Sequence, residues 1–461
     1  MLFQNTVHGH QKVLPLISHL FGLQQGRRLL THASAIKPTR VPTDEQTALS
    51  KLPAKTLLRS ALLTTVMSKP WLLRPSLAIM ELVVNSKSAL LNADKNPVLN
   101  RLLRWAVYNH FCAGTTCKEG SDAVRDTKKL GYHGVILGYA REVVLDPIEA
   151  LDHIPSDGAK YGPKHYEIID EWKKGNVETL DMLDAGDFLA VKVTGAGQIA
   201  LDAMQDKQPM PEYLERTLDE ICEETKKRGC RLWLDAEQQA LQPMLDEWAI
   251  ALMRKHNRGG QNLMYNTIQG YLKGSKANAE RHLTLAAQEG FTVAVKLVRG
   301  AYIENEIRSL IHDTKEETDR CYDEIADMFI SRRMPEGAKH LEFPSAALFL
   351  GTHNAASAEK ALEAHKQRVL AGLPLTPLEC GQILGMADEL SCKLLQDHDK
   401  CVADSRIGDK SPRILKAFIW GSVGECMGYL YRRTVENRGA VERTQHMAAA
   451  MREEIRRRVF G

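Results

Sequence analysis

The run Thr292-Val-Ala-Val-Lys-Leu-Val298 has the composition of a buried β-strand, because it is largely apolar and rich in β-branched residues. A longer, polar and amphipathic stretch, Asp313–Phe329, follows it, and a second strand-like run comes next at Ala347–Gly351. Strands that alternate with helices of this length are typical of βαβ units and a parallel sheet.

The same alternation extends through the chain from Leu130 onward. Eight strand-like runs can be counted, and one misread strand would instead favour an open, doubly wound sheet. Eight strands, most of them followed by a helix, predict an α/β fold of the (β/α)8 or TIM-barrel type. The strand candidates are Gly134–Leu137, Phe188–Val193, Arg231–Asp235, Leu263–Thr267, Thr292–Val298, Ala347–Gly351, Gly381–Leu384 and Ala417–Trp420.

Helix-like stretches lie between most of these strands. Their apolar residues recur at helical spacing, and Gly- and Pro-bearing loops separate them from the strands. The expected helices are Pro211–Arg228, Gln238–Lys255, Lys273–Glu289, Asp313–Phe329, Ser357–Arg368 and Ala387–Gln396.

The N-terminal third differs from this pattern. Residues 1–43 contain no Asp or Glu but five Lys or Arg residues, with Ser, Thr and scattered Leu, which is the composition of a mitochondrial transit peptide without stable structure. A disordered basic tail is the alternative. Residues 44–129 are rich in Leu and Ala and indicate a helical arm or cap, so that residues 130–461 would form the barrel. No apolar run approaches the ~20 residues of a membrane-spanning helix.

The composition narrows the class of protein. The net charge of +3 and the lack of a basic stripe with interleaved aromatics argue against a nucleic-acid partner. Nine cysteines without a CxxC pair indicate a reducing compartment, and we expect no disulfide and no structural metal. The C-terminal segment Glu442–Phe460 predicts a basic amphipathic helix, either a solvated face or a contact with an anionic membrane surface.

Three charged residues stand within or at the end of apolar strands, where a charge is costly unless it is paired. They are Lys192, Asp235 and Lys296. Each alone could be a structural ion pair, but together at the carboxyl ends of barrel strands they favour a polar active site. The strand-end sequence Thr352-His-Asn354 adds to that expectation.

The segment Tyr429-Leu-Tyr-Arg-Arg-Thr-Val-Glu-Asn437 follows the last strand. On a helix, Arg432 and Arg433 would lie about 100° apart and could clamp a carboxylate from two directions. A solvated charged helix is the alternative. A second motif, Gly195-Ala-Gly-Gln-Ile-Ala200, matches a relaxed dinucleotide-binding fingerprint. The acidic residue that should close the next strand, Asp235, lies about twice as far along the sequence as the fingerprint requires. We do not expect a nicotinamide site there.

Taken in order, the strand ends resemble those of the proline dehydrogenase family across roughly Gly131 to Ala440. The Gly138–Glu142 stretch is similar to the first-strand region of the family's mitochondrial, eukaryotic members, the fungal ones among them. The matching segments are Ala190-Val-Lys-Val-Thr194, Leu234-Asp-Ala-Glu237, Tyr265-Asn-Thr-Ile-Gln-Gly-Tyr-Leu-Lys273, Val295-Lys-Leu-Val-Arg-Gly-Ala-Tyr302, Thr352-His-Asn354, Gln382-Ile-Leu-Gly-Met-Ala-Asp388 and Tyr429–Asn437.

The resemblance implies a distorted (β/α)8 barrel that binds FAD and oxidises L-proline to Δ1-pyrroline-5-carboxylate. Electrons would pass to ubiquinone in the mitochondrial inner membrane. The protein would lie on the matrix side of that membrane and could contact it peripherally. The implied catalytic and substrate-binding residues are Lys192, Asp235, Arg432 and Arg433, with Glu142, Leu384 and Tyr429 also lining the substrate pocket. The implied FAD contacts are Gln269, Lys296, Arg299, Gly300, Ala301, Thr352, His353, Asn354 and Glu436.

One position departs from the family's pattern. Twelve residues before Tyr429, proline-specific members carry a Tyr over the substrate ring, whereas this chain has Ala417. The branch that prefers hydroxyproline also has a small residue there. The resemblance therefore implies a substrate pocket with room for 4-hydroxyproline, unless Trp420 fills the gap.

Two alternative hypotheses, which assign the chain to other functional classes, stay open at this point. A (β/α)8 lyase could use Lys192 or Lys296 as a Schiff-base amine. A barrel without catalytic activity could serve as a binding or scaffold protein.

Overall fold

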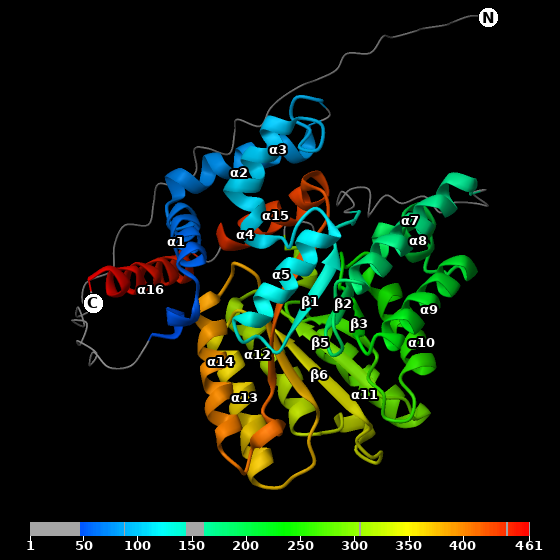
Figure 1. Cartoon of the computed structure of the whole chain (residues 1–461). Helices are drawn as coiled ribbons and strands as arrows, with labels where there is room; N and C mark the ends of the chain where they lie inside the picture. Colours follow the sequence, from blue (N-terminus) through cyan, green and yellow to red (C-terminus); the bar gives the residue numbers. More distant parts are fainter. Residues whose placement is uncertain (1–46, 87, 144–160, 304–305, 439–440, 461) are drawn as a thin grey trace, which may run out of the picture. The chain divides into compact units, whose positions relative to one another are not determined.

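Eight parallel strands form a closed barrel in chain order, because each strand pairs with the next and β1 also pairs with β8 (Figure 1). The computed structural model describes residues 47–86, 88–143, 161–303, 306–438 and 441–460, so the expected transit peptide lies outside the described residues. The (β/α)8 prediction is confirmed, and closure rules out the open sheet. The strands are β1 Gly134–Tyr139, β2 Phe188–Val191, β3 Arg231–Leu234, β4 Met264–Gln269, β5 Val293–Val298, β6 Ala346–Gly351, β7 Leu378–Ile383 and β8 Arg413–Trp420.

Alternate residues of each strand point into and out of the barrel. The inward side chains form an aromatic core that includes Phe188, Trp233, Tyr265 and Phe349. The outward residues of β5, such as Val293, pack in the larger core between the strands and the helices. Lys192, Asp235 and Lys296 lie two residues after the inward-facing Ala190, Trp233 and Ala294. Their side chains therefore point inward too, at the carboxyl end of the barrel.

Helices surround the strands, and all six predicted helices are present (Figure 1). Five match their expected bounds within a few residues, and the sixth, expected at Ala387–Gln396, extends to Ala403. Two further helices, α7 and α8, lie between β1 and β3 and were not predicted. In α7 only a narrow face, including Ile169 and Trp172, is buried, so its periodicity is weak. The helices are α7 Pro163–Leu180, α8 Gln198–Gln205, α9 Glu212–Lys227, α10 Gln242–His256, α11 Ser275–Glu289, α12 Lys315–Ile330, α13 Ala355–Leu370, α14 Asp388–Ala403, α15 Val423–Arg438 and α16 Val441–Phe460.

The glycines of the Gly195-Ala-Gly197 motif have packing roles. A Cβ on Gly195 would lie 2.5 Å from the carbonyl oxygen of Arg141, and Gly197 has a φ of +85° at the start of α8. Close packing and a left-handed turn account for both glycines.

The helices before β1 pack on the last part of the chain. Residues Thr47–Gly461 form one compact unit, in which Tyr108 donates a 2.7 Å hydrogen bond to the carbonyl of Gly421 and Ala113 donates one to Ile419. A shared apolar cluster joins Met80 of α2 to Leu430 of α15. The helices are α1 Ala54–Met67, α2 Pro70–Asn85, α3 Pro97–Leu103, a π-helical turn Arg104–Tyr108, α4 Asn109–Phe111 and α5 Cys117–Lys129.

The outward face of β8 carries a buried charge that the sequence reasoning overlooked. The ammonium of Lys416 lies 3.0 Å from Asp388 and 2.8 Å from the hydroxyl of Ser391, both on α14. Asp388 also accepts a hydrogen bond from Ser60 of α1. Burial alone would lower the pKa of Lys416, but Tyr132 and Asp388 outweigh it and keep the pKa above its ordinary value. This pair therefore ties the barrel to α14 and α1.

We expect Asp388→Ala to lower the free energy of unfolding by about 3–5 kcal/mol, because it leaves the Lys416 ammonium buried without a carboxylate. The melting temperature measured by circular dichroism would report the loss. The double change Lys416→Met with Asp388→Leu removes both charges and should recover most of the stability. A double variant that melts no higher than Asp388→Ala would contradict this account.

Candidate active site

At the mouth of the barrel, one carboxylate bridges two lysines. Asp235, directly after β3, lies 2.9 Å from the ammonium of Lys192 and 2.5 Å from that of Lys296. The Lys296 ammonium also lies 4.3 Å from the centre of the Trp233 ring, a cation–π contact. The side chains of the three charged residues expose only 10–16% of their surface. The structure therefore brings together three of the predicted site residues.

Burial and pairing set the charges of this cluster. Burial would raise the pKa of Asp235, but the two lysines outweigh it and hold that pKa well below the ordinary value. Burial would lower the pKa of Lys192, yet Asp235 and then Glu142 raise it. For Lys296 burial prevails over Asp235 and the pKa is lowered. Lys192 is thus a fixed cation, while Lys296 gives up its proton more easily.

A second carboxylate, Glu142, joins β1 to the helix after β8. It lies 2.6 Å from the guanidinium of Arg432 and 3.6 Å from Lys192, and it accepts a 2.7 Å hydrogen bond from Tyr302. The Arg432 guanidinium lies over the Tyr302 ring at 5.3 Å. Burial would raise the pKa of Glu142, but Lys192 and Arg432 lower it overall. Arg432 is therefore part of the same polar cluster as Lys192.

A third carboxylate, Glu237, lies behind this cluster. It accepts hydrogen bonds from the backbone and the hydroxyl of Thr194, and that hydroxyl accepts one from the backbone of Val143. Burial, followed by the charge of Glu142, raises the pKa of Glu237 to about 7. Glu237 thus fixes the backbone next to Glu142.

The remaining predicted substrate residues surround this cluster. Arg433 of α15 is buried and lies over the ring of Tyr429 at 5.2 Å. Ala417 of β8 packs against the aromatic barrel core and accepts a 2.7 Å hydrogen bond from the backbone of Leu384. The suggestion that Trp420 fills the space beside Ala417 is wrong. Its indole donates to Thr179 of α7 and packs in the outer core between strands and helices.

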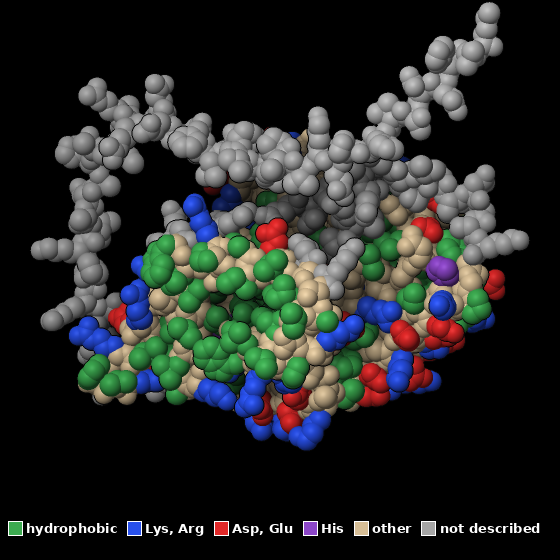
Figure 2. All heavy atoms as spheres, turned by 90° about the horizontal axis from the view of Figure 1, so that it is seen from above, with side chains coloured by type: hydrophobic (Ala, Val, Ile, Leu, Met, Phe, Trp, Pro, Cys, Tyr) green, Lys and Arg blue, Asp and Glu red, His purple; other side chains and the backbone are tan. Residues whose placement is uncertain are grey.

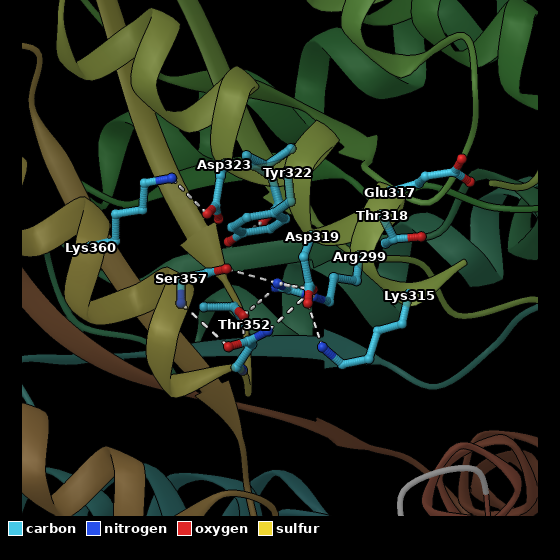
Figure 3. A network of polar contacts seen from close by, with 12 residues as sticks. Arg299, Lys315, Glu317, Thr318, Asp319, Tyr322, Asp323, Thr352, Ser357 and Lys360 are labelled. Carbon is cyan, nitrogen blue, oxygen red and sulfur yellow. Dashed lines mark hydrogen bonds and ion pairs between the residues drawn. The ribbon is translucent and has the colours of Figure 1, made fainter. Parts of the chain in front are cut away.

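The predicted cofactor residues cluster at the ends of β5 and β6. The guanidinium of Arg299 donates to Asp319 of α12, Thr352 and Ser357, at 2.7–3.1 Å (Figure 3). Asn354 donates to the same carboxylate at 3.2 Å, and its side chain caps α13. Burial would raise the pKa of Asp319, but Lys315 and Arg299 lower it. Arg299 is therefore held in one orientation by two helices.

The segment after β5 is closely packed against the ring of Tyr271. Gly300 has a φ of +143°, and a Cβ there would lie 2.4 Å from the Tyr271 ring, so only glycine fits. Ala301 beside it is half-buried. His353 accepts a 3.1 Å hydrogen bond from the backbone of Ile383, and Gln269 donates to the backbone of Glu237 at 3.2 Å.

The cations and amide donors at the ends of β4, β5 and β6 fit an anionic dinucleotide such as FAD. The side chain of Glu436 lies outside the described residues. Among the described residues, no group of His, Cys, Asp and Glu could hold a metal ion.

Glu237 and Tyr302 belong to the site, although no role was predicted for them. Their distance in sequence from predicted site residues could have indicated this. Glu237 comes two residues after Asp235, and Tyr302 follows the Arg299-Gly-Ala segment, so both share the mouth of the barrel with predicted residues. Thr194 gave no comparable signal, because a Thr after a strand is common.

A closed parallel barrel with paired charges gathered at the carboxyl ends of its strands has the architecture of a (β/α)8-barrel enzyme. Residues 121–446, well over half of the chain, match the family described as "Proline dehydrogenase". The chain therefore belongs to the proline dehydrogenase family.

Similar proteins fall into two groups by name. "Probable proline dehydrogenase, mitochondrial" of Schizosaccharomyces pombe is 28% identical over 451 residues, 88% of each chain. "Hydroxyproline dehydrogenase" of Rattus norvegicus is 28% identical over 411 residues, which cover 78% of this chain and 83% of that one. Among solved structures, proline utilization A (PutA) from Bdellovibrio bacteriovorus has a TM-score of 0.59 at 15% identity, over 86% of this chain and 39% of the other. That structural likeness shows the fold alone.

We expect Glu237→Gln to change how stability depends on pH. The raised pKa means that folded Glu237 keeps its proton between about pH 4.5 and 7, whereas the unfolded chain has lost it. The free energy of unfolding of the wild type should therefore fall as pH rises through this window. Glutamine has no such proton to lose. The urea-unfolding midpoint of the variant, relative to that of the wild type, should therefore rise between pH 5 and pH 8. Parallel curves for the two proteins would refute the assignment.

Proposed function

We propose that the chain oxidises L-proline to Δ1-pyrroline-5-carboxylate with bound FAD and passes the electrons to ubiquinone. The observation that carries the proposal is the cluster of Glu142, Lys192, Asp235, Lys296 and Arg432 at the barrel mouth, in a chain of this family. An amino acid needs a cationic contact for its carboxylate and a polar wall for its nitrogen, and this cluster supplies both.

The substrate carboxylate would bind between Arg432 and Arg433. In this structure Arg432 donates a hydrogen bond to Glu142 through one terminal nitrogen. A guanidinium has five N–H donors and can contact more than one carboxylate at once. Arg433 is buried beside Tyr429, which would hold the ring of the substrate. Two-point binding of the carboxylate fixes the orientation of the ring.

The reaction removes a hydride from the ring carbon next to nitrogen, on the side away from the carboxylate, and a proton from the nitrogen. FAD, when bound, would accept the two electrons. Gln269, Lys296, Arg299, Gly300, Ala301, Thr352, His353 and Asn354 would hold it, with Glu436 as a further contact. Lys192 and Asp235 would hold the substrate nitrogen in a pocket of fixed charge.

The lyase alternative is less well supported, because Schiff-base chemistry needs a neutral amine. Asp235 and Glu142 keep Lys192 charged. The pKa of Lys296 is lowered, but its side chain is held by an ion pair with Asp235 and a contact with the Trp233 ring. A barrel without catalytic activity would have little reason to hold five buried charges at its mouth.

The names of the relatives and the basic N-terminal composition support a mitochondrial location, on the matrix side if ubiquinone is the acceptor. Reduction of ubiquinone, a lipid-soluble acceptor, also implies contact with the surface of the inner membrane.

Ala417 favours a second candidate, oxidation of 4-hydroxyproline. It lies inside the barrel beside Leu384, and the indole of Trp420 faces α7. Relatives from Bos taurus and Rattus norvegicus carry the name "Hydroxyproline dehydrogenase". A small residue here would leave more room for a ring hydroxyl than a Tyr would.

The primary test is an absorbance spectrum of the purified protein, followed by anaerobic addition of L-proline. We expect a yellow flavin spectrum that bleaches with proline. Arg433→Met should keep the flavin but need roughly 100-fold more proline for half-bleaching, since a charged hydrogen bond is worth about 1.5–3 kcal/mol. A colourless protein that takes up no added FAD would overturn the proposal, and trapping of substrate by borohydride would favour the lyase.

Ala417→Tyr should raise the preference for L-proline over trans-4-hydroxy-L-proline by roughly tenfold in kcat/KM, because the added ring fills the space that a hydroxyl needs. Ala417→Ser, which adds no ring, is the matched control and should change the ratio little. If the ratio is the same for the Tyr variant and the wild type, Ala417 does not set the choice of ring.

A further inference from the structure

The helices before the barrel expose an unusual amount of apolar surface. Of the twenty large apolar side chains that are exposed among the described residues, ten lie between Leu58 and Trp105. In the view from above, hydrophobic side chains gather in one broad patch with Lys and Arg along its edge (Figure 2). We call this surface the arm face and define it by Leu58, Leu62, Trp71, Ile79, Val98 and Trp105.

The arm face follows the outward sides of three helices. On α2, Leu73, Leu77 and Met80 are buried, while Trp71 and Ile79 are exposed on the other side. Both sides of this helix are therefore apolar, whereas a helix on a solvated surface has a polar outer side. Leu58 and Leu62 on α1, and Val98, Leu102 and Trp105 from α3 onward, repeat the pattern at helical spacing.

Two tryptophans distinguish the arm face from a chance group of leucines. Trp71 and Trp105 expose 71% and 68% of their surface, whereas the other four tryptophans of the chain are buried. Tryptophan is enriched where hydrocarbon meets water, because its ring is apolar and its N–H is polar. No helix among the described residues is long and apolar enough to cross a bilayer. A helix such as α2 could instead lie in the interface.

Cations surround the apolar residues. Between Thr47 and Trp105 the sequence has nine Lys or Arg residues and two acidic ones. Lys55, Lys69, Arg74, Lys95 and Arg101 are exposed. Of the two acidic residues, Glu81 is exposed on α2, and Asp94 accepts hydrogen bonds from Ser422 and from the backbone of Gly424. The apolar residues therefore have a basic rim.

We propose that the arm face docks on a bilayer that contains anionic phospholipids, with Trp71, Ile79 and Trp105 inserted below the head groups. The basic rim is complementary to that surface. In a symmetric pair of chains the two rims would repel each other across the contact. Residues 1–43 hold five cations and no acidic residue, so their charge is not complementary to the basic rim.

The inference deepens the proposed function, since a quinone acceptor lies in a membrane. Binding to lipid needs neither flavin nor proline, so the two proposals can fail separately. A protein that binds vesicles but lacks flavin would refute the proposed function alone. A flavoenzyme that bleaches with proline but does not bind vesicles would refute the docking proposal alone.

The test is flotation of the full-length chain with vesicles of phosphatidylcholine, with and without 30 mole per cent (about one third) phosphatidylglycerol. We expect binding to the anionic vesicles and a blue shift of tryptophan fluorescence. Trp71→Ser with Ile79→Ser and Trp105→Ser should weaken binding at least tenfold. Arg74→Gln with Arg101→Gln should lower binding to anionic vesicles roughly fivefold for each charge.

The matched control is Leu370→Ser with Leu373→Ser and Val402→Ser. These exposed apolar positions lie at the end of α13, just after it and on α14, outside the arm face. It should bind as the wild type does. Equal binding of the arm-face variant and the wild type would overturn the proposal and assign binding to another segment, residues 1–46 among them. If light scattering shows that the arm-face variant turns a dimer into a monomer while vesicle binding is unchanged, the face joins two copies and the proposal fails.

Discussion

The carboxylate of Asp235, held between the ammonium groups of Lys192 and Lys296, sets the electrostatics of the barrel mouth. Two cations from different strands can stay buried at this distance only because a carboxylate from a third strand lies between them. That arrangement needs the three strand ends at one level, which the closed register provides. Glu142 and Arg432 extend the same alternation of charge to β1 and α15.

Much of the fold could be predicted from the sequence, because parallel strands buried on both sides are short apolar runs and the intervening helices keep an amphipathic period. The strand after Thr292 and the helix after Asp313 show both signals clearly. α7 was missed because its sequence, Pro163–Leu180, is polar on most of its circumference. The outward lysine Lys416 was missed because a strand sequence does not show which helix will supply its carboxylate.

The candidate site was partly predictable for a similar reason. Charges in the apolar strands marked Lys192, Asp235 and Lys296, and the rule that barrel strands end at one face brought them together. The pairing of Glu142 with Arg432 joins residues 290 positions apart, and no local pattern could indicate it. The position of Trp420 depends on which side of β8 it takes, and a shift of one residue reverses that side. The suggestion that it fills the space beside Ala417 was therefore wrong.

The hydrogen bond from Tyr108 to Gly421 spans 313 positions of the chain. Together with the contact between Ala113 and Ile419, it means that helices made early in synthesis have their packing partners near the end. Contacts so distant in sequence form late. The apolar surface of the arm helices therefore stays exposed until almost the whole chain has been synthesised or imported. During that interval the protein depends on chaperones more than a barrel without the arm would.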